Sequence, residues 1–138
     1  MRFSPSAMPH IADTGFLVAY WNKRDAHHRW ARGLAVTAPL RTCEAVLTET
    51  AYLLGTPEPL LQMLVDGDLT VDFTAEDHAP DLLRWLGKYA DLDPGFADAC
   101  VVKLGELHSR AEILTTDRRD FSAYRTLAGK PLRCVFPT

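Results

Sequence analysis

The sequence has few of the features that mark secreted or membrane proteins. It contains only three cysteines, Cys43, Cys100 and Cys134, and no C-x-x-C pair. Neither a disulfide framework nor a zinc knuckle is therefore indicated, and a reducing cytoplasm is the expected location. No segment approaches the roughly 18 consecutive apolar residues of a membrane span, so no membrane association is expected.

An excess of positive charge is also missing. The 138 residues include 15 Lys and Arg against 18 Asp and Glu, which gives a formal net charge of -3. Proteins that hold nucleic acid over a broad surface usually carry a basic excess or a basic face. Any contact with a polyanion must therefore depend on local groups of positive charge.

The composition is that of one globular domain. With 47% hydrophobic and 24% charged residues, a chain of this length can bury a core without disulfides or metals. No repeat, low-complexity tract or linker marks a second domain, so we expect a single domain over residues 10–138. Residues 1–9 have neither a long apolar core nor a small-residue cleavage site, and we expect a flexible tail there. Met8, just before the first predicted strand, is an alternative start.

Short apolar runs alternate with helical patterns along the chain. Strands are predicted at residues 10–12, 40–43, 69–73, 111–115 and 132–136. Helices are predicted at residues 16–21, 26–36, 44–54, 59–65, 75–89 and 97–108, with a loop or short helix at 117–124. Strands separated by helical stretches of roughly ten or more residues favour right-handed crossovers and a mostly parallel sheet. The predicted fold class is α/β, with helices on both faces of the sheet.

Two acidic residues follow predicted strands, and a third begins a predicted helix. Asp13 ends the first strand, and Asp117 follows the strand that contains Ile113. In an open parallel sheet, ligands bind outside the carboxyl ends of the strands, so these two side chains are expected at one edge. Asp98 lies in the first turn of its helix, where the dipole favours an ionised carboxylate.

A fourth acid, Glu49, is predicted from its surroundings. It is the only charged residue in segment 45–54, which is apolar on nearly every side. We expect its carboxylate to be buried, which is costly unless the group is paired or bound to a metal. Four carboxylates from distant segments would offer hard oxygen ligands suited to Mg²⁺ or Mn²⁺.

Each acid also has an ordinary explanation. Asp13 and Asp98 could cap helices, Asp117 could begin a turn, and Glu49 could pair with an arginine. The joint pattern carries the metal-site prediction.

Four segments in the same order resemble the acidic motifs of PIN-domain nucleases, and especially of VapC-like toxins. They are Ile-Ala-Asp-Thr-Gly at 11–15, Leu-Thr-Glu at 47–49, Phe-Ala-Asp-Ala at 96–99, and Ile-Leu-Thr-Thr-Asp-Arg-Arg-Asp-Phe at 113–121. The last segment is the most specific of the four. The similarity spans nearly the whole chain from His10.

This resemblance implies a three-layer α/β/α fold and Mg²⁺-dependent endoribonuclease activity. It implies that Asp13 and Asp98 are the principal metal ligands and that Glu49 and Asp117 complete the catalytic site. Thr14 and Thr116 correspond to positions where such proteins place hydroxyl groups that bond to the carboxylates. The implied partners are an RNA substrate, a cognate VapB-like antitoxin and a second copy in a homodimer.

Basic residues near the motifs are candidates for contact with the RNA backbone. Arg118 and Arg119 adjoin Asp117, and Arg24 belongs to a group that also contains Lys23. For that second group, an ordinary solvated face is an equally good explanation.

Other functions are less well supported. A haloacid-dehalogenase-like phosphatase requires Asp-x-Asp after the first strand, whereas Asp13 is followed by Thr14 and Gly15. A receiver domain requires paired acids near the first strand and a lysine after a late strand, and Arg118 is a poor substitute for that lysine. A non-catalytic PIN-like module that binds RNA or protein stays open, and its mark would be a missing acid.

Overall fold

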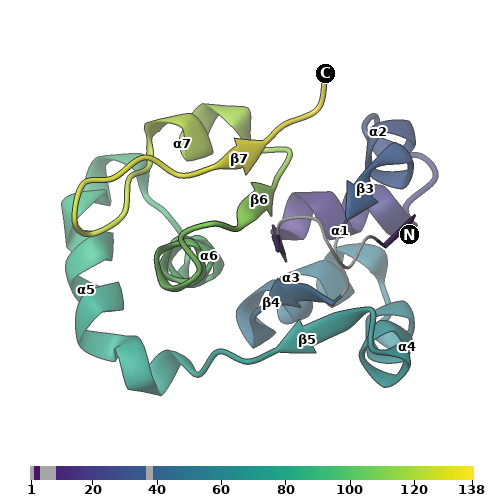
Figure 1. The fold of residues 1–138 in the computed structure, drawn as a ribbon, viewed down its shortest axis with the longest axis horizontal. Coiled ribbons are helices and arrows are strands. Elements are labelled where there is room, and N and C mark those ends of the chain that lie inside the picture. The colour runs from purple at the N-terminus through teal and green to yellow at the C-terminus, as the bar shows by residue number, and fades with distance from the viewer. Residues whose placement is uncertain (1, 4–8, 37–38) are drawn as a thin grey trace.

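In the computed structural model, which describes residues 2–3, 9–36 and 39–138, a five-stranded sheet forms the centre of the molecule (Figure 1). Its strands are, in spatial order, β5 (Leu69–Val71), β4 (Leu40–Thr42), β2 (His10–Ala12), β6 (Glu112–Leu114) and β7 (Cys134–Val135). All four neighbouring pairs are parallel. The predicted α/β class is confirmed.

The two central strands are apolar because they are covered on both faces. Ile11 and Ala12 of β2 are fully buried, as are Ile113 and Leu114 of β6 to within 1%. Ile11 lies opposite Ile113 in the register, so the core is continuous across the middle of the sheet. Strands buried on both faces have such runs of apolar residues instead of alternation.

In the described part of the chain, seven α-helices and two 3-10 segments flank the sheet. They are α1 (Thr14–Trp21), α2 (His28–Gly33), α3 (Glu44–Leu54), α4 (Glu58–Asp66), η1 (Ala75–His78), α5 (Ala79–Lys88), η2 (Ala90–Leu92), α6 (Phe96–Leu107) and α7 (Arg118–Ala123). Figure 1 shows α6 end-on between α5 and strand β6. None of these described helices has the length and apolar character needed to cross a membrane.

The helix predicted at residues 26–36 is wrong in its second half. Helix α2 ends at Gly33, and Leu34 takes an extended conformation that leads into β3 (Ala35–Val36). Strand β3 pairs in parallel with β1 (Arg2–Phe3). Of the tail predicted at residues 1–9, Arg2–Phe3 and Pro9 are described, and the other residues lie outside the described part of the chain.

The helix predicted at residues 75–89 is shorter than expected. Its first turn is the 3-10 segment η1, and α5 begins only at Ala79. Pro80 stands in the first turn of α5, where its missing backbone N–H costs nothing, whereas farther inside a helix it would remove a hydrogen bond. The side chain of Thr74, which precedes η1, makes no capping hydrogen bond.

Candidate metal centre

The acidic residues gather at the carboxyl ends of β2 and β6. Asp13 directly follows β2 and precedes α1, and Asp117 precedes α7 in the same way after β6. Asp98 lies in the first turn of α6. The predicted edge of the sheet therefore does carry acids from three separate segments.

Three carboxylates form the tightest group. Asp98, Asp117 and Asp120 each offer an oxygen that lies within 4.8 Å of the oxygens offered by the other two. All three side chains are partly exposed. The prediction omitted Asp120, although it stands in the quoted motif, three residues after Asp117 on the first turn of α7.

Asp117 belongs to this group and is also the N-cap of α7. Its Oδ1 accepts a hydrogen bond from the backbone N–H of Asp120 at 3.0 Å, which is an N-cap interaction. The cap fixes the short helix so that both carboxylates point to the same side.

Asp13 is the deepest acid of the site. It is only 5% exposed, and its Oδ2 accepts a hydrogen bond from the Thr115 hydroxyl at 2.7 Å. The pKa of Asp13 is raised from 3.8 to about 7, mainly by burial and also by the charges of Asp98 and Asp117, although the hydrogen bond from Thr115 lowers it. Because the negative charges of Asp98 and Asp117 contribute to the raised pKa of Asp13, the Asp13 carboxylate lies near the other two.

Glu49 is exposed, so the expectation that its carboxylate is buried is wrong. On α3, Val46 and Thr50 face inward, whereas Glu49 lies on the solvent side of the helix. Its Oε1 accepts a hydrogen bond from the Thr14 hydroxyl at 2.9 Å, and its charge is one of those that raise the pKa of Asp98. Glu49 is thus an exposed carboxylate near enough to Asp98 for its charge to act on it.

The hydroxyl that contacts Asp13 comes from Thr115 and not from Thr116. Besides donating to Asp13, the Thr115 hydroxyl accepts the backbone N–H of Asp117 at 3.1 Å. Thr116 instead packs its hydroxyl against Gly15, where an added Cβ would collide with it. This close approach explains the glycine of the Asp-Thr-Gly segment.

Asp98 is held by a residue that the sequence reasoning did not select. The Tyr124 hydroxyl donates a hydrogen bond to Asp98 Oδ2 at 2.8 Å. Burial raises the pKa of Asp98, the Tyr124 bond lowers it, and the charges of Asp117, Glu49 and Asp120 raise it again.

The acids of this group have no cationic partner among the described residues. The ion pairs between described residues all involve other carboxylates, such as the pairs of Lys103 with Asp81 and Glu106. Several carboxylates held close together without a counter-charge are a donor set that fits a hard divalent cation. The chemistry of the residues therefore agrees with a Mg²⁺ or Mn²⁺ site.

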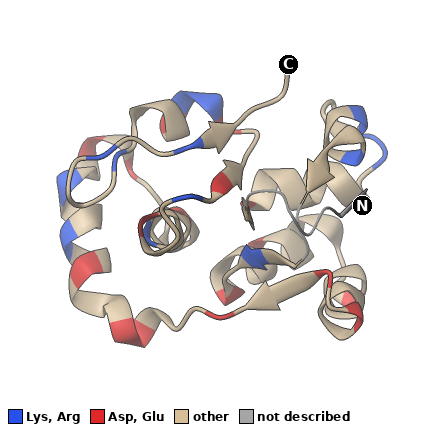
Figure 2. Cartoon of the chain, in the orientation of Figure 1, with Lys and Arg blue, Asp and Glu red and all other residues tan. Residues whose placement is uncertain are grey.

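The predicted substrate-binding arginines lie in two separate groups. Figure 2 shows the basic residues of α7 apart from those next to α2, which include the segment with Arg24. Arg118 donates to the carbonyl of Pro137 at 2.8 Å, and its guanidinium lies 4.7 Å from the centre of the Phe136 ring. Arg119, beside it on α7, is exposed.

A parallel α/β sheet with acids from several segments at its carboxyl edge is the arrangement that the PIN-domain resemblance implied. The family model described as "PIN domain" matches residues 11–127, and the chain belongs to this family. It is 30% identical to "Ribonuclease VapC26" of Mycobacterium tuberculosis (strain ATCC 25618 / H37Rv) over 132 residues, which cover 86% of this chain and 94% of that protein. The resemblance to VapC-like PIN proteins is confirmed.

Proposed function

We propose that this protein is a Mg²⁺-dependent endoribonuclease, with Mn²⁺ as an alternative metal, and that it acts as the toxin of a toxin–antitoxin pair. The observation that carries the proposal is the convergence of Asp13, Asp98, Asp117 and Asp120 without a described cationic partner. The name of the similar ribonuclease supports RNA as the substrate. The nuclease domain is proposed to span residues 10–138.

In this proposal the metal is held by Asp98, Asp117 and Asp120, with the buried Asp13 and the exposed Glu49 close by. A bound Mg²⁺ or Mn²⁺ supplies positive charge at the scissile phosphate and makes water a stronger nucleophile. Hydroxyl groups of the chain keep the acids in position, since Thr14 bonds to Glu49 at 2.9 Å.

The basic residues of α7 supply the contact with the RNA backbone. Exposed Arg119 is the best candidate, because Arg118 is engaged by the C-terminal segment. Arg24 would contact phosphates farther along the strand. The acidic group repels RNA until a cation is bound, so substrate binding and cleavage both depend on metal.

The proposed partners are a VapB-like antitoxin and a second copy of the chain, which co-purification and light scattering would test. A cytoplasmic location fits Cys43, Cys100 and Cys134, which are all free thiols. The alternative of a non-catalytic binding module predicts a missing acid, whereas the sequence contains all four motif acids.

The test is cleavage of total RNA by the purified chain with Mg²⁺ or Mn²⁺, and with a chelator. Asp98→Asn is expected to abolish cleavage, since it removes one carboxylate charge from the ligand set. Asp91→Asn, an exposed acid of η2, is the matched control and is expected to retain cleavage. Cleavage that persists in Asp98→Asn or in the chelator would contradict the proposal.

A further inference from the structure

Tyr124 links the acidic group to the hydrophobic core. Its side chain is fully buried, and its hydroxyl donates to Asp98 Oδ2 at 2.8 Å. Because a carboxylate oxygen only accepts hydrogen bonds, the Tyr124 hydroxyl is the donor of this bond. A buried donor that reaches one oxygen of one acidic residue can determine how that carboxylate is oriented.

Aromatic contacts and hydrogen bonds hold the Tyr124 ring on several sides. Trp85, Tyr89 and Phe121 meet it edge-on, with ring centres 4.9, 5.5 and 5.1 Å away. The Trp85 Nε1–H donates to the carbonyl of Arg125, and the Tyr89 hydroxyl accepts the N–H of Arg125, both at 2.8 Å. The backbone after Tyr124 is thus fixed together with its ring.

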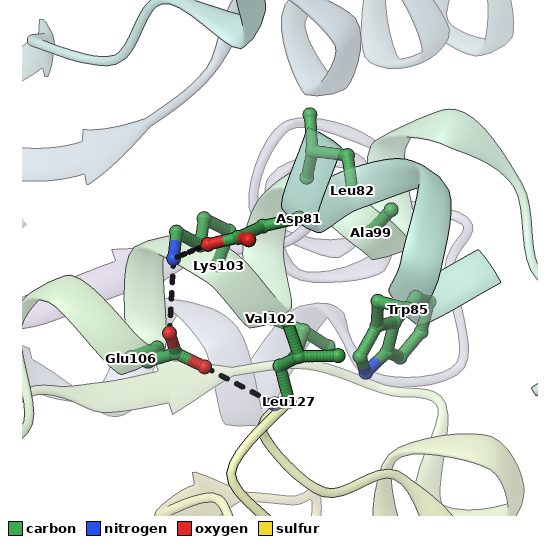
Figure 3. Close-up of a pocket in the computed structure, with 8 residues that line it drawn as sticks. All are labelled: Asp81, Leu82, Trp85, Ala99, Val102, Lys103, Glu106 and Leu127. Carbon is green, nitrogen blue, oxygen red and sulfur yellow. Dashed lines mark hydrogen bonds and ion pairs between the residues drawn. The ribbon is translucent and has the colours of Figure 1, made fainter. Parts of the chain in front are cut away.

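Helix α5, which provides Trp85 and ends just before Tyr89, is itself tied to α6. In Figure 3, Lys103 of α6 donates to Asp81 of α5 and to Glu106, both at 2.9 Å. The other oxygen of Glu106 accepts the backbone N–H of Leu127 at 3.1 Å. Trp85 lines the same small pocket, so α5, α6 and the segment after Tyr124 are joined around it.

We infer that Tyr124 is a positioning residue of the metal centre, which orients the Asp98 carboxylate for a divalent cation shared with Asp117 and Asp120. The inference rests on the proposed function. The torsion that turns an aspartate carboxylate is broad, so a free side chain samples many orientations. One directional hydrogen bond at Oδ2 removes this freedom before the cation arrives.

The experiment is titration of Mn²⁺ into the full chain, followed by the loss of the free-Mn²⁺ signal in electron paramagnetic resonance. Tyr124→Phe keeps the ring and removes only the hydroxyl, and Mn²⁺ affinity is expected to fall roughly 10- to 100-fold. Tyr89→Phe is the matched control, because it removes a hydroxyl with a hydrogen bond of equal length in the same aromatic cluster. Its Mn²⁺ affinity is expected to stay within about twofold of wild type.

Three further measurements separate positioning from general stability. Thermal melting of the two variants identifies any loss of folding, and RNA cleavage by Tyr124→Phe is expected to recover when Mn²⁺ is raised to saturation. In an Asp98→Asn background, adding Tyr124→Phe is expected to change Mn²⁺ affinity by less than about twofold, because the charged acceptor is already gone.

The outcomes distinguish this inference from the proposal on which it rests. If wild type binds Mn²⁺ and Tyr124→Phe binds it equally well, the inference is overturned while the nuclease proposal stands. A similar weakening in both tyrosine variants would also overturn it, since the effect would then come from the core. Failure of the wild-type chain to bind Mn²⁺ would overturn the nuclease proposal, and the inference with it.

Discussion

Replacing the buried acid of the metal centre is expected to stabilise the metal-free protein. Asp13 is 5% exposed, and its pKa is raised from 3.8 to about 7, mainly by burial. Above about pH 7 the folded chain must therefore hold a buried charge that the unfolded chain would expose to water. Asp13→Asn removes this charge while keeping the size of the side chain and an oxygen for the Thr115 hydrogen bond.

The sign of the pH dependence follows from the direction of the pKa shift. Because the pKa of Asp13 is higher in the folded chain, that chain binds more protons than the unfolded chain between pH 3.8 and about 7. The free energy of unfolding of the metal-free wild type therefore falls as pH rises through this window, and the loss is complete above the folded pKa. At about 1.36 kcal/mol per pH unit the upper bound is roughly 4 kcal/mol. Relaxation and water penetration reduce this value, so we expect roughly 2–4 kcal/mol.

Urea denaturation in a chelator, followed by circular dichroism, measures this effect. At pH 8 Asp13→Asn is expected to be more stable than wild type by the amount given above, and at pH 4 the two should be nearly equal. Adding Mg²⁺ at pH 8 should stabilise wild type more than the variant, because a ligand stabilises the state that binds it. Asp91→Asn, at an exposed position, serves as the control for loss of one negative charge.

Two results would refute this reasoning. One is an Asp13→Asn variant that is less stable than wild type at pH 8 without metal. The other is a stability difference between the two proteins that does not change from pH 4 to pH 8.

Two further substitutions test the packing around the site. Gly15→Ala is expected to lower the free energy of unfolding by roughly 1–3 kcal/mol in the urea assay, because the new Cβ collides with the Thr116 hydroxyl. Gly33→Ala is the control, because its Cβ would meet nothing within 4 Å, and it should not show this loss. Lys103→Met removes the shared partner of Asp81 and Glu106 and is expected to lower the free energy of unfolding by roughly 1–2 kcal/mol. A variant that melts at the wild-type temperature would contradict the bridging role of Lys103.

Elements with strong local signals could be predicted from the sequence. Helix α3 was predicted at 44–54 and is observed at Glu44–Leu54, ending at Gly55 with the positive φ of 83° that a left-handed C-cap needs. Strand β2 was predicted at 10–12 and is observed at His10–Ala12. Strand β3 was missed because it is only two residues long and pairs with β1, more than thirty positions earlier. Such pairing leaves no local pattern in the sequence.

The acidic site was predicted in its location but not in its details. Asp120 had a usable signal, since Asp117 and Asp120 have the spacing of an N-cap and the third residue of a helix. The exposure of Glu49 depends on which side of α3 faces the core. The sequence did not reveal that side, because the apolar residues Tyr52 and Leu53 are exposed as well. Tyr124 had no signal, because its bond to Asp98 joins residues that only the tertiary fold brings together.

The order of strands in the sheet has a consequence for protein synthesis. Strand β2 emerges early from the ribosome, but its neighbour β6 follows about a hundred residues later. A nascent chain that ends before β6 lacks the centre of its sheet as well as Asp117 and Asp120. Under the proposed function, an incomplete chain could not cut the messenger RNA from which it is being translated, and nuclease activity would appear only once nearly the whole chain has been made.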